Sequence, residues 1–150
     1  EWPADTQGAQ GNAGVSALIK GANGTIGYVD YSDAVVTGLS MASVRNRAGE
    51  YVAPSPASTS AAVAAAVVSE ELTYDPIDAA GAGAYPIAAP TWILAYSKQT
   101  DAAKADILKA FLNFVYTDGQ KLAPSIDYAA LPKSFVDKAV AQIAKIQSPA

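Results

Sequence analysis

The stretch that most constrains the fold runs from residue 81 to residue 98, GAGAYPIAAPTWILAYSK. It opens with glycine and alanine, and Pro86 and Pro90 then bias their neighbours towards extended backbone. Residues 91–96, TWILAY, follow as an uncharged run rich in aromatic and β-branched residues. A run this short, bounded by prolines, is typical of a strand buried on both faces. We therefore predict that it crosses between two packing units, one before it and one after it.

The composition excludes several classes of function. The 150 residues suffice for one domain with a core, and 14 acidic against 10 basic residues give a net charge of -4. This mixed charge argues against a nucleic-acid surface, and no apolar run approaches the roughly 20 residues of a membrane span. Cysteine and histidine are both absent. Thiol nucleophiles, histidine acid–base catalysis and Ser-His-Asp triads within this chain are therefore excluded.

Two short helices separated by a strand are predicted in the first 40 residues. Residues 11–21 form the first helix, with Asn12 as its capping side chain, and it buries Val15, Leu18 and Ile19. Residues 25–31, TIGYVDY, alternate as in a strand, with Gly27 allowing close backbone approach. A second helix starts at Ser32-Asp33 and closes at Gly38.

A hairpin and a helix are predicted next. Residues 39–45 and 50–53 read as strands joined by a turn at Asn46-Arg47-Ala48-Gly49. Ser55-Pro56 is a good helix start, because a capping serine precedes proline at the first helical position. An alanine-rich helix continues over residues 57–68.

The strongest helical pattern follows the crossing run. Thr100 or Asp101 caps this helix, which ends near Asp118-Gly119. Its apolar residues recur at helical spacing: Ala103, Ile107, Leu108, Phe111, Leu112 and Val115. A last amphipathic helix starts at Leu131-Pro132-Lys133 and carries Phe135, Val136, Val140, Ile143 and Ile146. Because helices and strands are mixed along the chain, the predicted class is α/β.

Residues near the predicted helix starts are the first candidates for a site. Gly11-Asn12 at a helix start can bind an anion, but a plain capping role is the favoured interpretation. Asp30 and Asp33 invite a catalytic carboxylate pair, but acidic residues are common in a first helical turn, so the pair carries little weight.

The remaining candidates have ordinary explanations. Arg45 and Arg47 alternate beside a turn and are interpreted as solvated surface. The aromatic residues Tyr28, Tyr31, Trp92 and Tyr96 fit a stacking platform, but strand aromatics are more often core. The acidic residues Glu70, Glu71, Asp75 and Asp78 lack the spacing of a calcium loop, and no phosphate-binding glycine loop occurs.

Three sequence blocks in this order resemble a known family. They are Gly11-Asn12-x-Gly14-Val15 with residues 24–31, GTIGYVDY; then Tyr85-Pro86-Ile87; and finally residues 127–132, DYAALP. Together they resemble the C-terminal half of the phosphate-binding receptors of phosphate ABC importers, the PstS family, from about Trp2 to Gln147. The alanine-rich composition of the chain is similar to that of actinobacterial members of the family.

The resemblance implies a two-lobed, class II periplasmic-binding-protein fold with mixed sheets flanked by helices. It places residues 1–84 in the second lobe, a hinge near Tyr85-Pro86, and residues 85–150 in the return to the first lobe. The family binds phosphate without chemistry, so no enzyme activity, cofactor or metal is implied. The implied partners are inorganic phosphate and the transporter permease, outside the cytoplasm, with a lipid anchor outside this chain.

The family's direct phosphate ligands include an Arg-x-x-x-Ser-Gly-Thr segment, which this chain lacks. We therefore expect the missing N-terminal half of the receptor to be a partner, and we expect Gly11, Asn12, Tyr31 and Ser32 to lie at the cleft edge only. Three alternatives stay open: a receptor for another oxyanion such as sulfate, a phosphatase-like enzyme, and an interaction module on the same scaffold. We also predict that the chain alone is poorly folded or self-associating, because apolar faces stay uncovered.

Overall fold

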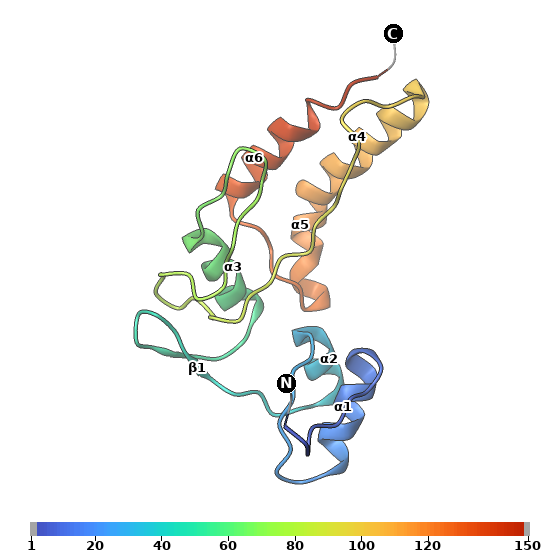
Figure 1. Cartoon of the computed structure of the whole chain (residues 1–150). Helices are drawn as coiled ribbons and strands as arrows, with labels where there is room; N and C mark the ends of the chain where they lie inside the picture. The colour runs from blue at the N-terminus through green and yellow to red at the C-terminus, as the bar shows by residue number, and fades with distance from the viewer. Residues whose placement is uncertain (1–2, 149–150) are drawn as a thin grey trace. The chain divides into compact units, whose positions relative to one another are not determined.

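The computed structural model describes residues 3–148, so Trp2, where the family likeness is expected to start, lies outside the described residues. The chain forms two compact units, Glu1–Ala42 and Ser43–Ala150, called here the N-terminal unit and the C-terminal unit (Figure 1). The lobe boundary expected after residue 84 stays a prediction, because these units are defined by packing within this chain alone.

The N-terminal unit contains two helices, α1 (Gly11–Gly21) and α2 (Tyr31–Thr37), as the sequence predicts. Gly38 ends α2 in the left-handed conformation, with φ +66°, and donates its N–H to the carbonyls of Ala34 and Val35. The first helix starts differently from the prediction. Gln10 occupies the N-cap position without a side-chain bond, and Asn12 lies inside the helix. The reason is that the Asn12 side chain binds two aspartates instead of the helix backbone.

The predicted strand over residues 25–31 is wrong. Residues 25–30 pair with no strand, Tyr31 belongs to α2, and the Tyr28 side chain is 81% exposed, so Tyr28 is not core. The segment contacts α1 at two points: the Thr25 hydroxyl donates to the Ile19 carbonyl at 3.1 Å, and a Cβ at Gly27 would lie 2.7 Å from Cδ1 of Ile19. A strand needs a neighbour for its N–H and C=O groups, and none is present for this segment within residues 3–148.

The C-terminal unit begins with the predicted hairpin, which is shorter than expected. Strands β1 (Val44–Arg45) and β2 (Tyr51–Val52) pair antiparallel, with Val44 opposite Val52. Helix α3 (Pro56–Ala65) follows. Its start is confirmed, because the Ser55 hydroxyl accepts the Ser58 N–H at 3.0 Å.

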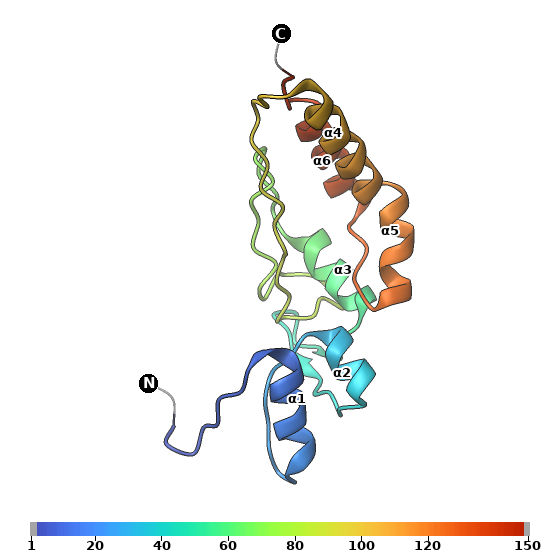
Figure 2. The ribbon, with the colours of Figure 1, turned by 90° about the vertical axis from the view of Figure 1, so that its right-hand side faces the viewer.

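The later helices are also confirmed. Helix α4 (Ala102–Tyr116) starts at Asp101, whose carboxylate accepts the Lys104 N–H at 3.0 Å. The short α5 (Asp118–Leu122), the 3-10 helix η1 (Ala123–Ile126) and α6 (Lys133–Ile143) follow. Helices α4 and α6 lie side by side (Figures 1 and 2). The helices share two small apolar clusters, one of Leu112, Ile143 and Ile146, the other of Val63, Phe135 and Ala139.

The predicted buried strand over residues 91–96 is wrong as well. These residues form no ladder and are all exposed; Leu94 is 93% and Tyr96 is 86% exposed. Only Trp92 has an aromatic partner, Tyr74, whose ring centroid lies 5.2 Å away in an edge-on arrangement. The extended backbone is present in Figure 2, but the neighbouring strands that would bury it are not among the described residues.

Two further expectations need correction for the same reason. The predicted stripe of α4 is only partly buried, since Phe111 is 56% exposed and Ile107 is exposed beside it. The predicted mixed sheets are absent from residues 3–148, where the hairpin is accompanied by one isolated parallel bridge, Lys98 to Gln147. Residue pattern alone predicts where strands can form, whereas a sheet also needs several strands to meet.

Candidate functional site

The starts of α1 and α2 are joined by one asparagine side chain within the N-terminal unit. The Asn12 Nδ2 group donates to the Asp30 carboxylate at 2.8 Å and to the Asp33 carboxylate at 3.0 Å. Its Oδ1 atom accepts the backbone N–H of Asp30 at 3.4 Å. We call these three residues the Asn12 junction. It fixes the entry to α2 against the first turn of α1.

The four residues predicted at the cleft edge come together around this junction. Gly11 is the first residue of α1 and adopts φ +63°, a conformation that favours glycine. Tyr31 and Ser32 are the first two residues of α2 and are half-buried. The structure therefore brings Gly11, Asn12, Tyr31 and Ser32 to one place in the unit, although their contact with a ligand stays a prediction.

The electrostatics of the junction favour bracing over anion binding. Helix N-termini carry partial positive charge, which a negative group stabilises. Here the carboxylates of Asp30 and Asp33 already lie beside these helix starts, and both accept a hydrogen bond from the Asn12 amide. A free anion placed at the same point would meet both negative charges. The two carboxylates therefore act with Asn12 rather than as the catalytic pair that the sequence suggests at first sight.

The other candidates in the sequence do not assemble into a site. Arg47 is held by Asp78, with Nε to Oδ2 at 3.2 Å, so it forms no anion clamp with Arg45. Among the described residues no group of three acidic side chains is arranged to hold a metal ion. Within residues 3–148, no helix is long and apolar enough to cross a membrane.

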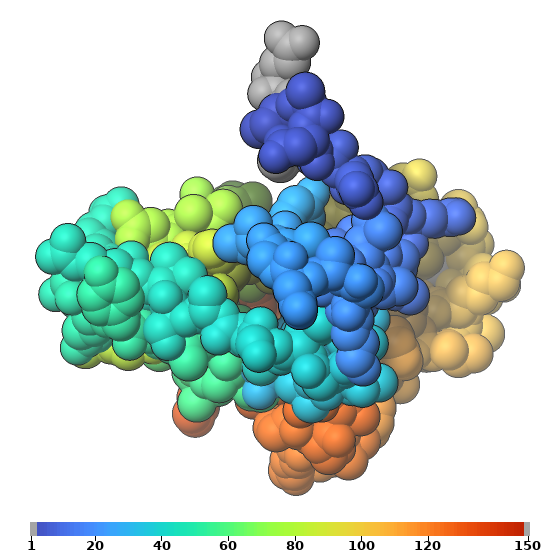
Figure 3. Space-filling view, turned by 90° about the horizontal axis from the view of Figure 1, so that it is seen from below, coloured from blue at the N-terminus to red at the C-terminus, as the bar shows by residue number. Residues whose placement is uncertain are grey.

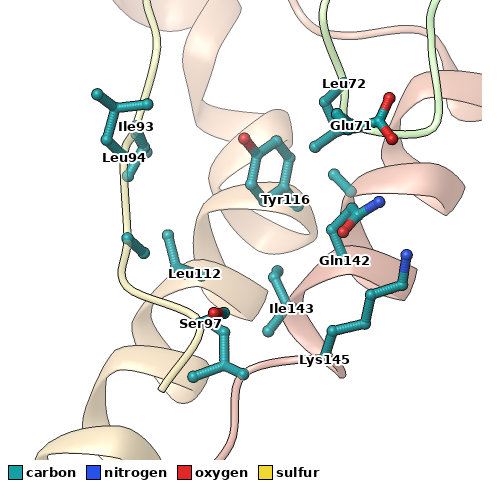
Figure 4. A pocket seen from close by; sticks show the side chains of 13 residues that line it. Glu71, Leu72, Ile93, Leu94, Ser97, Leu112, Tyr116, Gln142, Ile143 and Lys145 are labelled. Carbon is teal, nitrogen blue, oxygen red and sulfur yellow. The ribbon is translucent and has the colours of Figure 1, made fainter. Parts of the chain in front are cut away.

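A cavity of about 340 Å³ lies in the C-terminal unit, between the extended residues 93–97 and helices α4 and α6 (Figure 4). Its walls are mainly apolar and include Leu72, Leu112, Tyr116 and Ile143. Burial raises the pKa of the Tyr116 hydroxyl above its ordinary value. An apolar wall supplies no donors to replace the water around an oxyanion, so this cavity does not suit phosphate.

Comparison with known proteins identifies the class of protein to which the chain belongs. Residues 1–119 match the PBP superfamily domain. Because this match covers most of the chain, the chain belongs to the PBP superfamily.

Three individual relatives match most of the chain. The chain is 33% identical over 138 residues to the phosphate-binding protein PstS of Xylella fastidiosa (strain Temecula1), which covers 91% of this chain and 38% of the relative. It is 34% identical over 147 residues to that of Pasteurella multocida, covering 95% and 42%. It is 35% identical over 151 residues to that of Methanocaldococcus jannaschii, covering 88% and 38%. The predicted resemblance to this family is confirmed, and the chain spans 38–42% of the length of these three relatives.

Proposed function

We propose that this chain is the C-terminal portion of a solute receptor that binds inorganic phosphate for an ABC-type importer. The observation that carries the proposal is the extent of the similarity, which runs along 88–95% of the chain in three relatives named phosphate-binding protein PstS. In this proposal residues 1–84 belong to the second lobe, and residues 85–150 contain a hinge and return to the first lobe. The receptor works outside the cytoplasm and reaches the membrane through an anchor outside these residues.

The uncovered surfaces support a partner that completes the fold. Residues 25–28 and 91–96 are extended, exposed and without strand neighbours among the described residues. Helix α4 exposes Ile107, Phe111 and Phe114 at helical spacing. Unpaired strand edges and exposed apolar stripes favour association with complementary chain. The N-terminal portion of the receptor is the partner that we propose for them.

Binding rather than chemistry is the proposed activity. Phosphate is held when buried N–H and O–H donors replace its water, while an acceptor carboxylate selects an oxyanion that still carries a proton. In this proposal the N-terminal portion supplies those donors. Gly11, Asn12, Tyr31 and Ser32 stand at the cleft edge, where the Asn12 junction holds the two helix starts in place. Closure of the lobes then presents the loaded receptor to the permease.

The test is calorimetry on this chain assembled with the N-terminal portion of the receptor, titrated separately with phosphate and sulfate. We expect saturable heat with phosphate and none with sulfate at the same concentration. Heat with sulfate alone would favour a receptor for that anion instead. The absence of heat with both anions would refute an oxyanion receptor and favour an interaction module. Release of phosphate from a generic phosphate ester by the pure protein would refute the assignment as a receptor without chemistry.

A further inference from the structure

Asn46, in the turn of the β1–β2 hairpin, is a buried polar side chain that the proposed binding site does not use. It is 5% exposed. Its Oδ1 atom accepts the Glu50 N–H at 2.9 Å, and its Nδ2 atom donates to the Ala84 carbonyl at 3.2 Å and to the Glu50 carboxylate at 3.1 Å. The Gly81 carbonyl lies 3.4 Å from the same nitrogen. One amide thus connects the hairpin to a loop more than 30 residues further along the chain.

Glu50 makes the second connection between hairpin and loop. Its carboxylate accepts the Gly83 N–H at 2.7 Å, and Gly83 has φ +66°, which suits glycine. The hydrogen bond from Gly83 lowers the pKa of Glu50 below its ordinary value, and the bond from Asn46 adds a smaller effect in the same direction. Desolvation of the carboxylate opposes both effects. In Figure 3 the teal hairpin lies against the yellow-green residues of this loop. We call Asn46 and Glu50, with their bonds to residues 81–84, the hairpin clasp.

The loop held by the clasp is also tied at its ends. The Asp78 N–H donates to the Pro86 carbonyl at 2.9 Å, which closes the loop on itself. The Tyr85 N–H donates to the Ser58 carbonyl of α3 at 3.0 Å. Gly81 packs against α3 so closely that a Cβ there would lie 2.7 Å from Cβ of Ala65. Residues 78–86 are therefore held on two sides, by the hairpin and by α3.

Beyond the loop, Ala88 still packs in a buried cluster with Ala62 of α3 and Ala84, and the chain then runs without a backbone partner to the next anchor. Residues 87–96, called here the strap, make no backbone-to-backbone hydrogen bond within the described part of the chain. At the far end the Ser97 carbonyl accepts the Gln147 N–H at 2.7 Å, and the Gln99 N–H donates to the Gln147 carbonyl at 3.0 Å. The strap is thus an extended segment between two fixed points.

We propose that Asn46 is a positioning residue that anchors the start of the strap, so that bending of the chain is confined to residues 89–96, beyond the buried Ala88. This inference rests on the proposed function, in which residues 85–150 contain the hinge between the lobes, and it places that hinge in the strap rather than at Tyr85-Pro86. Hinges work by concentrating backbone change in a few residues between rigid elements. The clasp makes the upstream element rigid, because it binds the loop through a buried amide and a carboxylate at once.

The test is hydrogen–deuterium exchange on the full chain without phosphate, comparing Asn46→Ala with Arg47→Ala. The control removes the neighbouring exposed ion pair to Asp78 and leaves the clasp intact. Loss of a buried amide with its bonds is expected to accelerate exchange of the Gly83 and Tyr85 amides about tenfold. Amides of α4 and α6 are expected to stay unchanged. Glu50→Gln keeps an acceptor oxygen for Gly83 and is expected to retain most of the protection.

A second measurement links the clasp to the strap. In a Trp2→Phe background, Trp92 is the remaining tryptophan and reports on the strap. Asn46→Ala is expected to lower its fluorescence anisotropy, and Arg47→Ala is expected to leave it unchanged. Equal acceleration of exchange throughout α4 and α6 would reduce Asn46 to a general stabilising residue and overturn the proposal. Unchanged loop exchange, or unchanged Trp92 anisotropy in Asn46→Ala, would overturn it too. None of these outcomes depends on phosphate binding.

Discussion

Loss of the Asn12 junction is expected to destabilise the starts of α1 and α2. Replacing Asn12 with alanine removes two hydrogen bonds to carboxylates and the weaker bond from the Asp30 N–H. Bonds to charged groups contribute about 1.5–3 kcal/mol each when buried, but Asp30 is exposed and can recover water. We therefore expect a total loss of about 1–2 kcal/mol, since solvent screens both contacts. The loss is local, because the junction joins only the starts of α1 and α2.

Hydrogen exchange of the α2 amides measures this loss directly. Asn12→Ala is expected to accelerate exchange over residues 31–37 by about tenfold, while α4 keeps its protection. Asn12→Asp is expected to have a larger effect, because it places a third carboxylate beside Asp30 and Asp33. The matched control is Asn113→Ala, which removes an exposed asparagine that donates to the Lys109 carbonyl within α4. Unchanged exchange of α2 in both Asn12 variants would refute the bracing role.

Three further predictions concern the C-terminal unit. Leu94→Lys is expected to reduce self-association of the isolated chain, measured by light scattering, whereas Thr91→Lys adds the same charge without removing an apolar group and serves as control. Because the pKa of Glu50 is lowered in the folded protein, the stabilisation of the loop by its carboxylate is present above the ordinary pKa of 4.5 and is lost as the pH falls below it. Hydrogen exchange over residues 78–86 is therefore expected to rise at low pH in the natural chain. It is not expected to rise in Glu50→Gln. Phe135→Ala, in the cluster with Val63, is expected to cost about 3–4 kcal/mol in denaturant unfolding of the assembled protein. A cost below about 1 kcal/mol would show that this cluster is not core.

Local signals in the sequence were sufficient for the helices. Ser55 and Asp101 cap α3 and α4 as predicted, because a cap needs only the next few residues of the same segment. Gly38 ends α2 for a similar local reason, its left-handed backbone. The hairpin turn at residues 46–49 was also predictable, since its two strands are close in sequence.

The candidate site was predictable only in outline. The sequence places Gly11, Asn12, Tyr31 and Ser32 at one cleft edge, yet it does not specify the bonds from Asn12 to Asp30 and Asp33. These residues are 18 and 21 positions apart from Asn12, and nothing in a local pattern specifies which of the possible partners a side-chain amide meets. The same holds for Asn46, which looked like a turn residue and proved to hold a distant loop.

The sequence by itself determined the helices, the caps of α3 and α4, the hairpin and the likeness to phosphate receptors, because each depends on residues close together or on motifs in a given order. Only the tertiary structure decided whether residues 25–31 and 91–96 become strands and what Asn12 and Asn46 bind. The physical reason is that a strand satisfies its backbone groups on another segment, just as a buried amide satisfies its own on distant partners. Where no such segment lies nearby, an apolar run stays extended and exposed.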